Sequence, residues 1–150
     1  NILNAIAEGK IESGDEKKLN ALKGETMAVI ALCQFDLTRC FGYPYTKDNG
    51  ASLGAPLIDH LVGTYENPSR STVAQAYDFI IETLEEAVTL MSEEKNNGRM
   101  NKYAARALLA RVYLYHNDNR KAFDMADQLI KDVDASGSYA LYPHEKYVAA

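Results

Sequence analysis

The sequence is short of positive charge and has no long apolar run. Its 21 Asp and Glu residues outnumber its 16 Lys and Arg residues, and the net charge of −5 argues against a nucleic-acid partner, because binding phosphates needs a basic face. No apolar run approaches the roughly 18–20 residues that cross a bilayer. The first ten residues also lack the basic start, apolar centre and cleavage site of a signal peptide. The chain does not begin with Met, and we expect it to be part of a longer protein.

Cysteine is scarce too, and the two cysteines, Cys33 and Cys40, are seven residues apart in one predicted helix. At a rise of 1.5 Å per residue their Cα atoms lie about 10 Å apart, beyond the roughly 7 Å reach of a disulfide. No other metal-ligating residue accompanies them at the spacing of a metal site. We therefore expect both to be small apolar residues of the core.

Length and composition are those of one ordinary globular domain, with 150 residues, 47% apolar and 25% charged. Apolar residues recur at helical spacings, and in the first helix they include Val29 and Leu37. The predicted helices span about 15–41, 72–91, 101–116 and 119–133, after a short helix at 2–7. Gly42 follows the first helix as a terminator, and Thr72 with Gln75 forms a capping box at the start of the second.

Residues 101–130 contain no Gly or Pro, and their first helix is apolar on two faces. One face comprises Ala105, Leu108, Leu109, Val112 and Tyr115, and the other comprises Ala104, Ala107 and Leu114, interrupted by Arg111. A helix that is apolar on two sides is expected to have neighbours on two sides, as in a stacked array of helical hairpins. The next helix is expected to present Ala122, Met125, Ala126, Leu129, Ile130 and Val133 inward.

The short polar connection "HNDN" makes these two helices antiparallel neighbours. Ala110, Tyr113 and Ala122 have the spacing of three positions in a tetratricopeptide repeat (TPR), although no clean 34-residue period is present. We therefore predict an all-α fold of TPR-like helical hairpins in a single domain, 1–150. Two antiparallel helix pairs are expected, the first opened by a long inserted loop at about 42–70.

No arrangement of residues indicates an enzyme or a metal site. Glu82, Glu85 and Glu86 form a row of solvated charge, and His60, His116 and His144 are scattered. "DVDASG", residues 132–137, imitates the start of a calcium loop, but Pro143 stands where the bidentate Glu should be. A helix end at Gly137 is the better interpretation.

Arg106 and Arg111 interrupt an otherwise apolar helix. They could mark a contact with a partner. We favour long stems that cover apolar neighbours, with heads that reach water or a carboxylate.

Several segments in a fixed order resemble the SusD/RagB family of outer-membrane nutrient-uptake lipoproteins of Bacteroidetes. They are "CFGYPY", "LGAPL", "RSTVAQAYDFIIETLEEAVTLM", "NKYAARALLARVYLYHNDNRKAFDMADQLI" and "GSYALYP". The resemblance covers nearly all of the chain. It departs at Thr83, where the family has the acid of an Asp-Leu pair, and at Asn119-Arg120, where an aromatic residue often precedes the helix.

The resemblance implies a surface-exposed lipoprotein of the outer membrane that binds glycans, is not an enzyme and needs no cofactor. Such a protein covers a SusC-like TonB-dependent transporter and passes oligosaccharides to it. The present segment is then mainly scaffold and transporter contact, and membrane association depends on a lipid anchor outside it. The alternative is a general TPR-like scaffold that binds a protein partner.

Candidate ligand-binding residues lie in the inserted loop, because structureless loops beyond roughly 12–15 residues are usually functional or disordered. Tyr43, Tyr45 and Tyr65 are expected either to stack on sugar or, with better odds, to pin the loop to the helices. Lys47, Asp48 and Asn49 are the candidates for contacts to sugar hydroxyls, and "KDNG" also suits an exposed turn.

Overall fold

A computed structural model describes residues 2–11, 14–58, 60, 62–95, 98–140 and 143. Its helices are α1 (Ile2–Ala7), α2 (Glu16–Phe41), α3 (Val73–Leu90), α4 (Lys102–Tyr115) and α5 (Asn119–Ser136). Between α2 and α3 lie a 3₁₀ turn, η1 (Tyr45–Lys47), and the strands β1 (Leu53–Pro56) and β2 (Arg70–Thr72). The predicted helical fold is confirmed, and the small sheet is an addition to it. In this described part, no helix has both the length and the apolar character needed to cross a membrane.

Each long helix begins at a residue whose side chain satisfies a free backbone N–H group. The Asp15 carboxylate accepts from the Lys17 N–H at 3.0 Å, and the Asn101 side chain accepts from the Ala104 N–H at 3.0 Å. The predicted capping box is present, since the Gln75 N–H donates to Thr72 Oγ1 at 3.1 Å and the Thr72 N–H donates to Gln75 Oε1 at 2.9 Å. The predicted helix starts are therefore confirmed.

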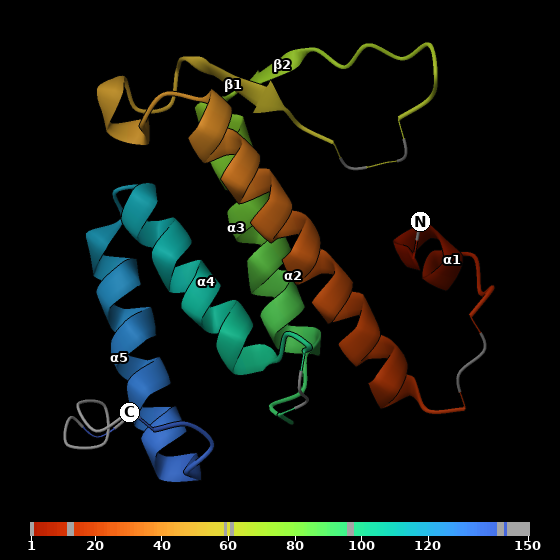
Figure 1. The fold of residues 1–150 in the computed structure, drawn as a ribbon, viewed down its shortest axis with the longest axis vertical. Coiled ribbons are helices and arrows are strands. Elements are labelled where there is room, and N and C mark those ends of the chain that lie inside the picture. Colours follow the sequence, from red (N-terminus) through yellow and green to blue (C-terminus); the bar gives the residue numbers. More distant parts are fainter. Residues whose placement is uncertain are drawn as a thin grey trace.

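The helices form a row in which α2 packs against α3, α3 against α4, and α4 against α5 (Figure 1). Successive long helices run antiparallel, as predicted for two hairpins (Figure 1). The largest fully buried side chains come from α2, α3 and α4, the three helices nearest the middle: Phe35, Thr38, Val73, Ile80, Leu84, Leu109 and Val112. Phe35 meets the ring of Tyr77 edge to face, with centroids 6.2 Å apart.

The outer face of α2 contradicts part of the sequence analysis. Cys33 and Cys40 are free thiols on the surface, so the prediction that they belong to the core is wrong. Val29 and Leu37, also expected to face the core, are exposed as well. The reason is that α2 buries one side, which contains Ala31, Phe35 and Thr38, while these four residues point away from it.

The second apolar face of α4 is also not buried in this chain. Ala104, Ala107 and Leu114 are exposed. Tyr115, which was expected on the first face, is exposed for 45% of its surface. α4 does have neighbours on two sides, but α5 packs beside Arg106 and Tyr113 instead. On α5, the expected inward position of Ile130 is wrong in the same way, since Ile130 is exposed.

Arg70 ties the inserted loop to the end of α2. Its guanidinium donates to the carbonyl oxygens of Gly54 at 2.7 Å, Leu53 at 2.9 Å and Phe41 at 3.3 Å. β1 and β2 are antiparallel, with Leu53 opposite Thr72 and Pro56 opposite Arg70. The loop therefore begins and ends at the same end of the α2–α3 pair (Figure 1).

Candidate functional site

A cavity of about 310 Å³ lies where the C-terminal end of α2, the start of the inserted loop, α3 and the end of α4 meet. Four tyrosines and one arginine give it its chemical character: Arg39, Tyr43, Tyr45, Tyr77 and Tyr115. Ligand cavities in proteins combine apolar and aromatic walls with a few polar groups, and this cavity has both.

The ring of Tyr45 fixes the loop against the helices. It meets Tyr77 edge to face, with centroids 5.6 Å apart, and its centroid lies 4.2 Å from that of His116. Gly50 allows this approach, because its φ is +76° and a Cβ atom there would lie 2.7 Å from both the Tyr45 ring and the Ala74 backbone nitrogen. Tyr45 therefore has the anchoring contacts that the sequence analysis favoured, and it also forms one wall of the cavity.

Arg39 places a positive charge at the edge of this cavity. Its guanidinium carbon lies 4.9 Å from the centroid of the Tyr115 ring and 5.2 Å from that of Phe35. The same guanidinium pairs with Asp36 one turn earlier on α2, with a distance of 3.2 Å. The cation–π contacts and the ion pair together hold the guanidinium beside Tyr115, a residue that is 45% exposed.

Burial raises the pKa of Tyr77 to about 12, and the Arg39 charge opposes that rise only in part. The Tyr77 hydroxyl therefore stays protonated over the physiological range and can donate a hydrogen bond. Across the described residues, the buried Nδ1 atom of His116 has no hydrogen-bond partner. Flat ring faces next to hydroxyl and guanidinium groups suit a ligand that has both apolar faces and hydroxyl groups.

The structure brings only some of the predicted binding residues together. Tyr43 and Tyr45 line the cavity, and the Lys47 ammonium lies 3.0 Å from the centroid of the Tyr43 ring. Asp48 and Asn49 do not line it. The Asp48 carboxylate accepts a hydrogen bond from Ser52, whose hydroxyl is the main cause of a lowered pKa of Asp48, and Asn49 has a φ of +57° in an exposed turn.

Tyr65 lies outside the cavity and is 96% exposed, so the favoured expectation that it pins the loop to the helices is wrong. Of the five residues that give the cavity its chemical character, Arg39, Tyr77 and Tyr115 were missed. Tyr115 was expected on an apolar helix face, and neither Tyr77 nor Arg39 was predicted as a binding residue. All three residues lie near helix ends that meet the inserted loop. A residue at such an end can pack in the core and still line a surface cavity, so this position could have indicated a role in binding.

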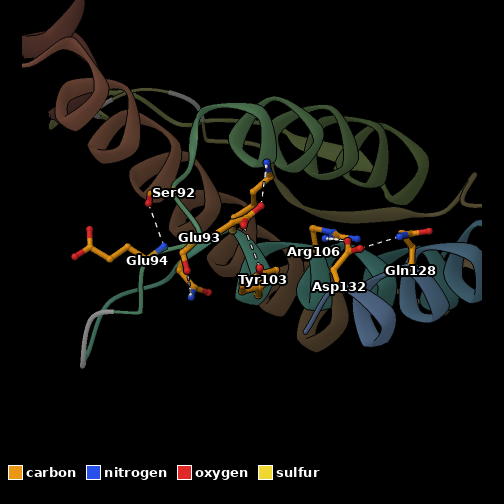
Figure 2. Close-up of polar contacts among 9 residues, drawn as sticks. Ser92, Glu93, Glu94, Tyr103, Arg106, Gln128 and Asp132 are labelled. Carbon is orange, nitrogen blue, oxygen red and sulfur yellow. Dashed lines mark hydrogen bonds and ion pairs between the residues drawn. The ribbon is translucent and has the colours of Figure 1, made fainter. Parts of the chain in front are cut away.

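A second cavity, of about 490 Å³, lies between α2 and the segment that follows α3. Two of its charged residues pair with each other, since the Glu25 carboxylate accepts from the Arg99 Nε at 2.9 Å, and Glu25 also accepts from the Met100 N–H at 3.2 Å. The adjoining segment is braced locally, with the Glu94 N–H donating to Ser92 and the Tyr103 hydroxyl donating to Glu93 (Figure 2). Unlike the tyrosine-lined cavity, this cavity has no aromatic residue in its wall.

The calcium-like segment is a helix end. The Asp132 carboxylate accepts hydrogen bonds from Arg106 at 2.6 Å and from Gln128 at 2.8 Å (Figure 2). Gly137 ends α5 with a φ of +64°. In the part of the chain that the structure describes, no group of three metal-ligating side chains occurs. The interpretation of Arg106 as an arginine that reaches a carboxylate is confirmed. Leu141 and Tyr142 of "GSYALYP" and His144 lie outside the described residues.

Residues 1–114 match a family of SusD-like proteins described as starch-binding proteins that associate with the outer membrane. No curated protein matches the chain.

Solved structures are similar over nearly the whole chain. A SusD superfamily protein from Bacteroides vulgatus is 95% identical, with a TM-score of 0.94, and the match covers 99% of this chain and 33% of that one. A SusD superfamily protein from Bacteroides thetaiotaomicron is 43% identical, with a TM-score of 0.90 and coverage of 97% and 31%. A laminarin-binding SusD-like protein shares the fold at 22% identity, with a TM-score of 0.67 and coverage of 85% and 26%. The chain therefore spans between about a quarter and a third of the length of these structures.

Proposed function

Since the chain belongs to the SusD-like family of proteins that associate with the outer membrane, we propose that the full-length protein captures oligosaccharides at that membrane. The capture is by binding, without catalysis. The bound oligosaccharide then passes to a SusC-like TonB-dependent transporter, and a lipid anchor outside these 150 residues holds the protein at the surface.

The tyrosine-lined cavity carries this proposal. Sugar rings have apolar C–H faces and a rim of hydroxyl groups. Tyr43 and Tyr115, which are 57% and 45% exposed, offer ring surface for such faces. The Arg39 guanidinium and the Tyr77 hydroxyl offer donors to sugar hydroxyl groups. With about 310 Å³, the cavity is at the lower end of ligand sites, which suits one or two sugar rings of a longer chain.

The rest of this segment serves mainly as scaffold and as a contact for the transporter. An exposed row on α2 supports a protein contact, because Val29, Cys33, Leu37 and Phe41 recur every four residues. The row continues into an apolar groove of about 540 Å³ beside Ala55, Pro56 and Ile58. The same surface favours the second candidate function, a TPR-like scaffold for another protein partner. Detection of a peptide partner, with no glycan bound, would support that alternative.

Affinity electrophoresis of the full-length protein tests the proposal. Gels that contain starch, laminarin or other bacterial, host and plant polysaccharides are expected to retard the native protein in at least one case, whereas bovine serum albumin runs unchanged. Migration that no polysaccharide alters would contradict oligosaccharide as the cargo. The 150-residue segment alone is expected to bind weakly or not at all, because ligand surface from the rest of the protein is absent.

A further inference from the structure

The wall of the tyrosine-lined cavity is positively charged. Among the described residues, Arg39 is the only one in this wall with a charged side chain, whereas the whole sequence has a net charge of −5. The charge also acts on α3, since burial raises the pKa of Tyr77 and the Arg39 charge opposes that rise. Beside the cavity, the Lys47 ammonium lies 3.0 Å from the centroid of the Tyr43 ring and adds a second positive charge.

The same wall offers hydrogen-bond donors but few acceptors. Within the part of the chain that the structure describes, no Asp, Glu, Asn or Gln side chain lines the cavity. Its hydroxyl groups belong to tyrosines and to Thr38, whose hydroxyl already donates to the Gln34 carbonyl oxygen at 2.7 Å. The hydroxyl groups of a neutral sugar donate as well as accept, so they also need acceptors. A carboxylate only accepts, and therefore fits a wall that is rich in donors.

The Arg39 guanidinium keeps one edge free for a ligand. Nη1 donates to Asp36 at 3.2 Å, and the structure gives Nε and Nη2 no hydrogen bond to any described residue. A guanidinium matches a carboxylate by donating two parallel hydrogen bonds, and the Nε–Nη2 edge supplies such a pair of donors. The Asp36 carboxylate is more than half exposed, so the ion pair positions the guanidinium without using all of its donors.

We propose that the tyrosine-lined cavity selects sugars that carry a carboxylate, such as uronic acids. The Arg39 guanidinium binds the carboxylate through two hydrogen bonds, and the exposed rings of Tyr43 and Tyr115 contact the apolar faces of the sugar chain. This selectivity rests on the proposed function, because it requires that the cavity binds oligosaccharide.

Affinity electrophoresis of the full-length protein tests the selectivity. Each gel contains polygalacturonate, alginate or hyaluronan, or the carboxyl-reduced form of the same polymer, in which every carboxylate has become a primary alcohol. At least one carboxylated polymer is expected to retard the protein, and its reduced form to retard it little or not at all. Equal retardation by both forms, or retardation by neutral polysaccharides only, would overturn the selectivity and leave oligosaccharide capture standing. Migration that no polysaccharide alters would contradict the proposed function as well.

A gel with dextran sulfate distinguishes a carboxylate site from general attraction to polyanions. The sulfated polymer is expected to retard the protein less than the carboxylated one does. Equal or stronger retardation by dextran sulfate would overturn the proposal, because any dense negative charge would then be sufficient.

Isothermal titration with an oligosaccharide of the retarding polymer assigns the selectivity to Arg39. The native protein is expected to bind the acidic form about tenfold more tightly than the carboxyl-reduced form. Arg39→Gln should bring this ratio close to one. The matched control Arg120→Gln removes the same charge from an exposed ion pair with Asp124 on α5, and should keep the ratio. A ratio that Arg39→Gln leaves unchanged would overturn the proposal.

A salt series with the native protein makes the test independent of any substitution. Raising the salt concentration to about 0.5 M should weaken binding of the acidic form severalfold and leave the reduced form unaffected, because salt screens charges. A preference for the acidic form that salt does not weaken would overturn the proposal. Circular dichroism and melting of Arg39→Gln show whether the variant has folded.

Discussion

Arg106 on α4 and Asp132 on α5 form the ion pair that joins the last two helices, with 2.6 Å between Nη1 and Oδ2. The Arg106 side chain is only 11% exposed, and Gln128 donates to the other carboxylate oxygen. Replacement of Asp132 by Asn removes the negative charge and leaves a largely buried guanidinium without its partner, so the melting temperature should fall.

The matched control is Asp127→Asn, on a different face of α5. Asp127 pairs with Lys131 in an exposed i,i+4 arrangement, which should change melting much less. Equal shifts for the two variants would contradict the role given to Arg106.

The Arg106–Asp132 pair and the Arg99–Glu25 pair both predict that the stability of the fold depends on pH. The hydrogen bond from Arg106 lowers the pKa of Asp132 from its ordinary 3.8, and the hydrogen bond from Arg99 lowers the pKa of Glu25 from 4.5. As the pH falls, the unfolded chain takes up these protons before the folded chain does. Their contribution to stability is therefore complete above pH 4.5 and is lost as the pH falls through the lowered values. Urea denaturation along a pH series should show a smaller acid loss for Asp132→Asn than for the native protein. An unchanged slope would refute the assignment.

Tyr113 ties α4 to α3 through its hydroxyl. Its ring is buried, and the hydroxyl donates to Glu85 Oε1 at 2.5 Å. Replacement of Tyr113 by Phe should lower the free energy of unfolding by about 1 kcal/mol, because a hydrogen bond to a charged group is lost. Tyr77→Phe is the matched control, since the Tyr77 ring is buried too and the structure gives its hydroxyl no hydrogen bond within the described residues. Chemical denaturation measures both variants, and a cost for Tyr77→Phe as large as that for Tyr113→Phe would contradict the account.

Gly24 of α2 lies directly against the C-terminal end of α3. A Cβ atom at this position would lie 2.7 Å from Met91 Cγ and 2.9 Å from the Ala87 carbonyl oxygen. In an open helix, Gly→Ala stabilises by roughly 0.5–1 kcal/mol. Here the clash with backbone should reverse the sign, so that Gly24→Ala lowers the urea midpoint. Gly14→Ala, where a Cβ atom would meet nothing within 4 Å, controls for the general effect of the substitution. A raised midpoint for Gly24→Ala would show that the helices can separate without cost.

Most of the helical framework could be predicted from the sequence, because caps and periodicity are local signals. Asp15, Thr72 and Asn101 mark helix starts through bonds to residues two or three positions away, and the motif resemblance to SusD-like proteins is confirmed. Burial was harder to predict. Cys33 and Ile130 fit the helical spacing of apolar residues, yet both are exposed. Whether an apolar face is buried depends on how many other helices pack against that helix. The local sequence pattern does not contain this information.

The candidate site was predicted only in part for a related reason. Tyr43 and Tyr45 were found because they belong to the inserted loop, where a functional role was already expected. Tyr115 and Arg39 reach the cavity from two different helices, 76 residues apart in the sequence, and only the packing of α4 near α2 brings them to 4.9 Å. Lys47 does not line the cavity and contacts only the ring of Tyr43, and Tyr65 and Asn49 also lie outside the cavity.

Isothermal titration of the full-length protein and its tyrosine variants, with an oligosaccharide of the polysaccharide that retards it, tests the binding site most directly. Tyr43→Ala and Tyr115→Ala should each weaken binding by about tenfold, which corresponds to roughly 1.4 kcal/mol. Tyr65→Ala, which removes a fully exposed tyrosine outside the cavity, should leave the affinity unchanged. Full affinity in both cavity variants, or a loss confined to Tyr65→Ala, would contradict the assignment of the tyrosine-lined cavity as the sugar site.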